Sequence, residues 1–194
     1  MCTILHNLKA EEFIHPFDKD AMAVINAVPG LDKLTEWILQ NSVEVFYNIQ
    51  LKGSSIRLNE QNSPRIYRIY RQTAEILGIT KLPDLFLQRG YQFLNRIIGH
   101  HTPIILLHTN CVERLDHTQL RFILGRCLSG IMLGHNKLEF FCDIVNTIGT
   151  ATLPTVASAL SLPLSQWHRK SELSRDRGGL LAAQNFDAAM MTMM

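Results

Sequence analysis

In the N-terminal third of the chain, apolar residues recur every three or four positions, which is the spacing of one face of a helix. The pattern predicts a helix that Asp18 caps and that stops before Pro29, followed by a second helix over residues 31–39. A third helix is predicted to begin at Pro64, because proline suits the first helical turn, and to end at Gly78.

The middle of the chain has a different pattern. Three short apolar runs, at residues 84–88, 91–95 and 104–108, are separated by glycine, proline and polar residues, so they are predicted to be strands joined by turns. Asp116, followed three residues later by Gln119, is the sequence signature of a capping box and predicts the start of a long, buried helix.

Residues 167–194 are again rich in helix formers, so the order of elements implies an α+β fold that is mostly helical and has a small sheet. With 194 residues, 46% hydrophobic and 19% charged, the chain is long and apolar enough for one domain with its own core. We expect a single domain over residues 1–194, with a helical part at 1–80 and the sheet with two further helices at 81–194. The net charge of +2 is too small for a nucleic-acid binder, so no nucleic-acid partner is expected.

The cysteines and the uncharged segments indicate the compartment. Cys2, Cys111, Cys127 and Cys142 lack any Cys-x-x-Cys spacing and are interpreted as reduced thiols. The N-terminus lacks the pattern of a secretory signal. The uncharged residues 144–167 are interrupted by polar residues and prolines, so no transmembrane helix is expected. These features predict a cytoplasmic protein.

Several stretches together resemble one family. Residues 119–135 (QLRFILGRCLSGIMLGH) resemble the active-site helix of the gluzincin zinc metallopeptidases of the HtpX and CAAX-prenyl endopeptidase type, which carries His-Glu-x-x-His followed by Gly-His. Residues 167–181 (WHRKSELSRDRGGLL) are similar to the family's second helix, whose glutamate supplies the third zinc ligand. Residues 94–99 lie where the family has its substrate-aligning edge strand, and stretches at 13–18 and 63–67 also have counterparts. The resemblance implies a zincin-like peptidase scaffold with the small sheet packed on the active-site helix.

The resemblance also implies that catalysis is lost. In the family, two histidines and a distant glutamate bind zinc, and the glutamate beside the first histidine is the general base. Here these three helix positions hold Arg126, Cys127 and Gly130, and only the carboxylates of Glu172 and its companion Asp176 remain. Arginine is a permanent cation that repels zinc, so we expect no bound metal, no other cofactor, no catalytic residue and no peptidase activity.

A metal site rebuilt from other residues is an alternative. His100 and His101 are adjacent and are expected to point in different directions, and His135 is expected to lie off the helix face of Gly130. Cys127 is at a mid-helix core position with no histidine to orient it, so it is interpreted as a small buried side chain and not as a nucleophile.

The sequence therefore favours an inactive metallopeptidase homologue, a pseudopeptidase, that acts as a peptide- or protein-binding regulatory module. The candidate binding edge is Asn95, Arg96 and Ile97, to which an extended peptide could be added as a further strand. Two alternatives stay open: a metalloendopeptidase with a non-standard metal site, and a structural partner subunit of an active paralogue that docks through the apolar residues 190–194. The sequence identifies neither the partner nor the oligomeric state.

The loss of zinc would leave Glu172 without its counter-charge in a partly buried site, which is costly. We therefore predict an ion pair between Arg126 and Glu172 that is shared with Asp176, because a guanidinium matches carboxylates in geometry and charge. Such a pair would hold the two helices together in place of the metal.

Overall fold

The computed structural model describes residues 2–40, 49, 51–90, 95–145 and 154–194. These residues form an α+β fold that is mostly helical and contains a small mixed sheet, as the sequence predicted. The strands are β1 (Ile56–Arg57), β2 (Asp84–Gln88), β3 (Arg96–Ile98) and β4 (Ile104–His108). The helices of the described residues include α1 (Ala10–Phe13), α2 (Pro16–Asn26), α3 (Leu31–Gln40), α5 (Pro64–Ile76), α6 (Thr109–Arg114), α7 (His117–Met132), α8 (His135–Ile144), α10 (Pro154–Ala183) and α11 (Phe186–Met193).

The sheet has the strand order β1-β2-β4-β3. Strands β2 and β4 are parallel, with Asp84 beside Ile104 and Gln88 beside His108, whereas β1 and β3 pair antiparallel with their neighbours. The bounds predicted for the strands now labelled β2 and β4 are confirmed. Within the described residues β3 pairs only with β4, so it is an edge strand.

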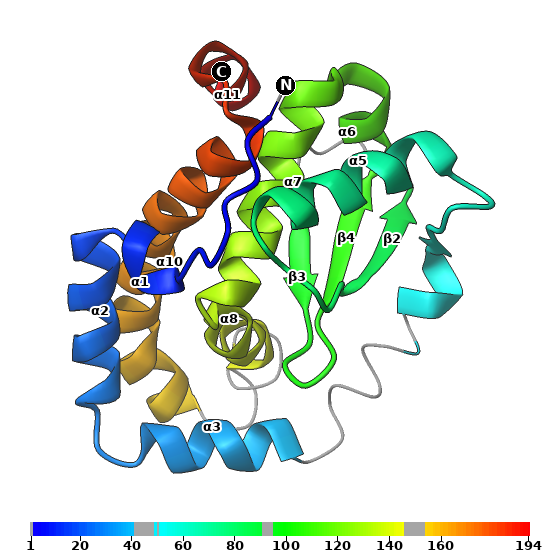
Figure 1. Cartoon of the computed structure of the whole chain (residues 1–194). Helices are drawn as coiled ribbons and strands as arrows, with labels where there is room; N and C mark the ends of the chain where they lie inside the picture. The colour runs from blue at the N-terminus through cyan, green and yellow to red at the C-terminus, as the bar shows by residue number, and fades with distance from the viewer. Residues whose placement is uncertain (1, 41–48, 50, 91–94, 146–153) are drawn as a thin grey trace.

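One face of the sheet packs against α7 and α5 (Figure 1). Helix α7 begins at the predicted capping box: the Asp116 side chain accepts hydrogen bonds from the backbone N–H groups of Thr118 and Gln119, and the Gln119 side chain accepts one from Asp116. The main core then joins this helix to the sheet, and burial of its apolar surface fixes α7 over β4 and β3. It includes Leu85, Ile97, Ile105, Leu107, Leu120, Leu124, Cys127 and Leu128.

A second core lies where α2, α3, α8 and α10 meet (Figure 1). Beside it, the fully buried carboxylate of Asp18 accepts a hydrogen bond from Ser174 Oγ at 2.5 Å and lies 3.1 Å from His135 Nε2. These contacts tie α2 to α10 and α8. The apolar members of the core include Ala21, Ile25, Leu31, Leu138, Phe141, Leu164 and Trp167.

The predicted role of Asp18 as a helix cap is wrong. Helix α2 begins at Pro16, and the capping side chain is that of His15, which accepts a hydrogen bond from the backbone N–H of Phe17. Asp18 lies one turn further on and points inward, because its partners on α8 and α10 satisfy the carboxylate there. A helix cap needs only a hydrogen-bond acceptor that is close in sequence. The inward position of the Asp18 side chain depends instead on residues far along the chain, which the local sequence does not reveal.

Two other details differ from the sequence pattern. Strand β1 lies within residues 1–80, the part predicted to be helical, and its two residues are too few to show an alternating pattern. The strand predicted over residues 91–95 falls mostly outside the described residues, since only Asn95 of this run is described, directly before β3.

Helices α7 and α10 pack closely because glycines lie at their contact. A Cβ atom at Gly125 would lie 2.4 Å from Cβ of Ala182, and one at Gly179 would lie 2.6 Å from Cγ of Arg126. A glycine inside a helix costs about 1 kcal/mol relative to alanine, and here the close contact of the two helices offsets that cost. The approach brings Arg126 directly onto the face of α10.

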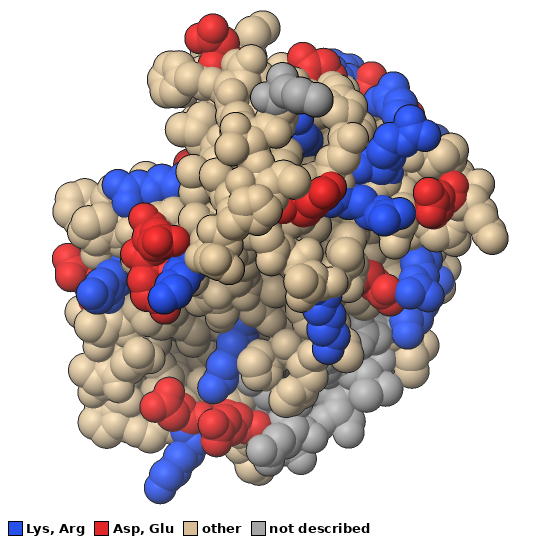
Figure 2. All heavy atoms as spheres, viewed as in Figure 1, with Lys and Arg blue, Asp and Glu red and all other residues tan. Residues whose placement is uncertain are grey.

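The surface carries both signs of charge. Figure 2 shows acidic and basic side chains interspersed over the visible face, in keeping with the net charge of +2. Among the described residues, none of the helices has the length and apolar character that a bilayer span requires.

Candidate functional site

Helix α7 positions the residues that the sequence singled out. Cys127 is fully buried against the sheet, and its Sγ atom accepts a hydrogen bond from Asn95 Nδ2 at 2.7 Å. The same amide lies 3.4 Å from the carbonyl oxygen of Ile123, so Asn95 ties the start of β3 to α7. Burial raises the pKa of the Cys127 thiol, which agrees with its interpretation as a core side chain and argues against a nucleophile.

The predicted ion pair between Arg126 and Glu172 is present. One guanidinium nitrogen of Arg126 contacts Glu172 Oε2, and Nε lies 2.7 Å from Asp176 Oδ1. Glu172 and Asp176 are four residues apart on α10, so both carboxylates face the same side chain of α7. The guanidinium also lies over the Phe122 ring, 5.9 Å from its centroid. Arg126 therefore joins α7 to α10 through two carboxylates.

A second guanidinium completes the cluster. Arg175, only 5% exposed, donates through Nη1 to Glu139 on α8 and to Glu172 Oε1, the latter at 2.8 Å. Burial opposes the charge of Arg175, but Glu139 and then Glu172 raise its pKa, so the cation is firmly held. Two arginines and three carboxylates thus form one continuous network between α7, α8 and α10.

The sequence pattern did not indicate Glu139 or Arg175 as site residues. Glu139 lies in α8, for which no helix was predicted, and the two residues are 36 positions apart in the chain. A local pattern does not signal such a pair. The one signal in the sequence is the position of Arg175 between Glu172 and Asp176, the two expected site carboxylates, which could have suggested a role for this arginine in the site.

The residues at the histidine positions of the resembled family do not fit a zinc ion. Arg126 brings a fixed positive charge that is already paired with Glu172 and Asp176. A Cβ atom at Gly130 would lie 2.9 Å from Ile97 Cδ1, so Ile97 would have to shift to admit a side chain there, whereas the 3.4 Å to Arg175 Nε is an ordinary van der Waals contact. Positions 126 and 130 therefore offer no ligand atom for zinc where the resemblance places the two histidines.

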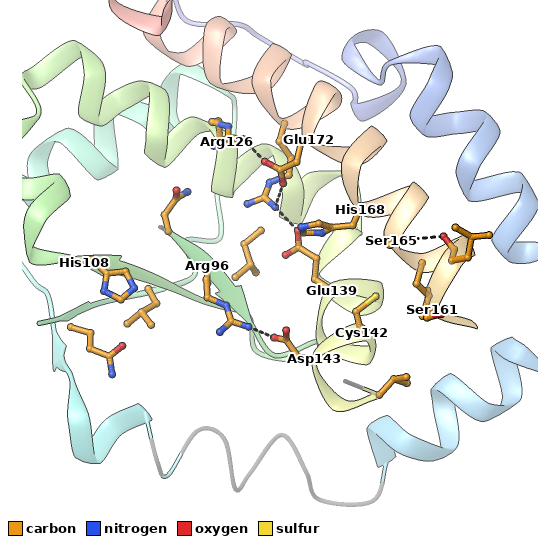
Figure 3. A pocket seen from close by; sticks show the side chains of 18 residues that line it. Arg96, His108, Arg126, Glu139, Cys142, Asp143, Ser161, Ser165, His168 and Glu172 are labelled. Atoms are coloured by element: carbon orange, nitrogen blue, oxygen red, sulfur yellow. Dashed lines mark hydrogen bonds and ion pairs between the residues drawn. The ribbon is translucent and has the colours of Figure 1, made fainter. Parts of the chain in front are cut away.

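A pocket of about 890 Å³ opens beside this network, between β3, the outer face of the sheet and helices α8 and α10 (Figure 3). Arg96 projects from the edge strand across its floor and lies 2.5 Å from Asp143 on α8. Burial raises the pKa of Asp143, although Arg96 pulls it in the opposite direction. Apolar side chains form much of the remaining wall, among them Ile97, Leu106, Cys142, Leu162 and Leu164.

The candidate binding edge therefore borders the pocket. Asn95, Arg96 and Ile97 all line it; Asn95 directly precedes β3, and Arg96 and Ile97 belong to this strand, which is an edge of the sheet within the described residues. Ile97 is buried toward α7, whereas the side chain of Arg96 is half exposed, as a charged residue on an edge strand often is.

The histidines considered for a rebuilt metal site do not gather at Arg126. His135 is buried against Trp167 and pairs with Asp18, and the rings of His100 and His101 lie beside each other, with centroids 4.7 Å apart. A different group does come together among the described residues: Glu139, His168 and Glu172 each offer one ligand atom, and these atoms lie within 4.8 Å of one another.

Comparison with known proteins supports a metallopeptidase-like family for this chain. A similar protein is the plastoglobule-localized metallopeptidase 48, chloroplastic, of Arabidopsis thaliana, with 28% identity over 197 residues. The alignment covers 98% of this chain and 57% of that protein, so the chain spans little more than half the length of the relative. No family model and no solved structure matches the chain.

Proposed function

We propose that this chain is a catalytically inactive, zincin-like homologue of the zinc metallopeptidases of the HtpX and CAAX-prenyl endopeptidase type. The observation that carries the proposal is the position of Arg126, which is paired with Glu172 and Asp176 where the resemblance calls for a zinc ligand. With Cys127 at the general-base position and buried, the helix offers no group that could activate water there.

In this proposal, the single domain acts as a binding module. The pocket beside β3 would take an extended peptide, whose backbone pairs with the edge strand and whose side chains enter the pocket. The arginines that line the pocket, Arg96, Arg126 and Arg175, are matched by the lining carboxylates Glu139, Asp143 and Glu172, so an uncharged, partly apolar peptide suits it best.

A substitution that narrows the pocket tests peptide binding. Leu162 lines the pocket and is 62% exposed, whereas Leu173 lies on the same helix, is 38% exposed and does not line it. Peptides selected on the wild-type protein from a displayed random library should bind Leu173→Arg as well as wild type and should bind Leu162→Arg much more weakly. Equal binding to all three proteins would show that the peptides occupy another surface.

Catalytic inactivity is tested separately. The purified protein, supplied with zinc, should not cleave casein or a quenched fluorescent peptide library above the level of the Glu172→Gln variant. Cleavage that a chelator abolishes and that Glu172→Gln lacks would favour the second candidate, a metalloendopeptidase with a non-standard metal site, for which the grouping of Glu139, His168 and Glu172 is the supporting observation.

A third candidate is a structural partner subunit of an active paralogue. It is supported by α11, on which Phe186, Met191 and Met193 are each more than half exposed. Co-purification of an active paralogue with the wild-type protein, and its loss when Met191 and Met193 are both changed to lysine, would favour this candidate over the peptide-binding module.

The cytoplasmic location is also a proposal. The reduced cysteines suit it, while the similar plant protein is named for the plastoglobule. Cell fractionation with an antibody against this chain should recover it with cytoplasmic markers, and recovery with a lipid-particle or organelle fraction would contradict the proposal.

A further inference from the structure

Three side chains with metal-ligand chemistry meet at one wall of the pocket. His168 and Glu172 are four residues apart on α10 and share a face of that helix, and Glu139 reaches the same place from α8 (Figure 3). One ligand atom from each lies within 4.8 Å of the other two. None of the helix positions 126, 127 and 130, which the resemblance assigns to the peptidase zinc site, takes part.

Each of these side chains has lone pairs to offer. Among the described residues, no hydrogen bond is made by the ring nitrogens of His168, and only Oε1 of Glu139 is bound, by Arg175. Both oxygens of Glu172 accept from arginines, yet an ionised carboxylate has about four acceptor positions in total. The guanidiniums of Arg126 and Arg175 hold the carboxylates in place, as outer hydrogen-bond partners do around bound metals.

We propose that Glu139, His168 and Glu172 bind a divalent transition-metal ion of the Zn²⁺ class, displaced from the peptidase position toward α8. One imidazole nitrogen and two carboxylate oxygens suit Zn²⁺ or Co²⁺, whereas Mg²⁺ and Ca²⁺ prefer ligand sets made of oxygen alone. The pocket gives the ion access from solvent and room for water as a further ligand. The sequence-based expectation of no metal weighed positions 126, 127 and 130 together with His100, His101 and His135, and did not consider Glu139 or His168 as ligands.

The site needs a small adjustment to close around an ion. Ligand atoms at about 2.1 Å from a tetrahedral zinc lie about 3.4 Å apart, so the side chains must approach one another by about 1 Å. His168 is exposed and can rotate to do so. The neighbouring guanidiniums oppose the charge of the ion, so we expect affinity in the micromolar range and not the tighter binding of a structural zinc site.

Bound metal would link α8 to α10 at the pocket wall. The proposal does not depend on peptide binding: the peptide experiment uses Leu162 and Leu173, which are outside the ligand set. A failure of one proposal therefore leaves the other standing.

The test is titration of the chelator-treated, full-length protein with Zn²⁺, followed by competition with a chromophoric chelator, and with Co²⁺, followed by visible absorption. Wild type should bind about one ion per chain, and His168→Gln should bind at least about tenfold more weakly, since even loss of an outer partner typically costs that much. The matched control is His101→Gln, which removes a histidine from the adjacent pair of His100 and His101 and should bind like wild type. Zn²⁺ should also raise the melting temperature of wild type and of His101→Gln but not of His168→Gln.

Each outcome decides the proposal. Binding by wild type that His168→Gln loses and His101→Gln keeps supports it. No binding by wild type, equal binding by all three proteins, or a loss confined to His101→Gln overturns it. The Glu139→Gln variant tests a second proposed ligand. Because this substitution also weakens the contact with Arg175, the Co²⁺ spectrum of the variant is compared with that of wild type only after circular dichroism has shown that the variant folds.

Discussion

The side chain of Ile97 limits the space beside Gly130: a Cβ atom at position 130 would lie 2.9 Å from Ile97 Cδ1, whereas Arg175 borders the same space at ordinary contact distance, 3.4 Å from Nε and 3.5 Å from Cδ. Glu139 and Glu172 hold Arg175 in this position beside Gly130. A histidine at position 130 would need a change on α10 as well.

The first prediction follows from this contact. Gly130→Ala should gain little or none of the about 1 kcal/mol by which alanine stabilises a helix interior relative to glycine, because the added methyl group would lie 2.9 Å from Ile97 Cδ1 and Ile97 must shift. Urea denaturation measures the change. The control is Gly53→Ala: a Cβ atom there meets nothing within 4 Å, so this variant should be as stable as wild type or slightly more stable. If Gly130→Ala is more stable than wild type by about 1 kcal/mol, Ile97 does not limit the space beside Gly130.

The second prediction concerns the coupling of Arg126 and Glu172. Their side chains are 17% and 32% exposed, so the pair is only partly screened by solvent. Arg126→Ala should destabilise the protein, and a double-mutant cycle with Glu172→Ala should give a coupling energy of about 1–3 kcal/mol. This value is smaller than the loss of about 3–5 kcal/mol that is typical when one partner of a fully buried ion pair is removed.

The matched control for this cycle is the exposed ion pair of Arg57 and Asp84, which joins β1 to β2 with 64% and 43% of the side chains exposed. Its coupling should stay below about 1 kcal/mol. Additive effects of the Arg126 and Glu172 changes would mean that Arg126 does not act as a link between α7 and α10.

The sequence predicted the features that depend on local pattern or on chemistry at known positions. Strands β2 and β4, the capping box of Asp116 and Gln119, and the Arg126–Glu172 ion pair are all present. The ion pair was predictable because the resemblance placed two helices face to face and one of them carried a cation opposite a carboxylate.

The features that the sequence missed depend on contacts between distant segments. Asp18 has the sequence context of a helix cap, but Ser174 and His135 draw it into the interior. Glu139 lies on a helix without a clear start signal, since the N-cap position is Gly134 in a left-handed conformation. The grouping of Glu139 with His168 exists only because α8 packs beside α10, and no spacing along the chain encodes it.

A third prediction concerns the thiols. Burial raises the pKa of Cys111 and Cys127, and raises that of Cys142 to about 12, so little thiolate forms at these positions in mildly alkaline solution. Iodoacetamide should therefore modify Cys2 in the folded protein and leave the other three unmodified, as measured by mass spectrometry of peptides. In urea all four should react. Modification of Cys127 in the folded protein at the rate of Cys2 would reopen its interpretation as a nucleophile.

The last prediction is a dependence of stability on pH that originates at Asp18. Burial alone would raise the pKa of this carboxyl, but hydrogen bonds from His135 and Ser174 outweigh it and the pKa is lowered. The charged form is therefore favoured in the native state, and its contribution is complete above the unfolded-state pKa of about 3.9 and is lost as the pH falls through the lowered native value.

Asp18→Asn should accordingly lower the free energy of unfolding at neutral pH by about 1.5–3 kcal/mol, the range for hydrogen bonds to a charged group. The gap between this variant and wild type should shrink as the solution is acidified below the unfolded-state pKa, because the wild-type carboxyl then becomes neutral as well. Asp20→Asn is the control: Asp20 is exposed on the same helix, so this substitution should leave stability nearly unchanged at every pH. Urea denaturation of the three proteins across the acidic range measures both effects. A gap for Asp18→Asn that stays constant with pH would mean that packing, and not the charge held by His135 and Ser174, accounts for the loss.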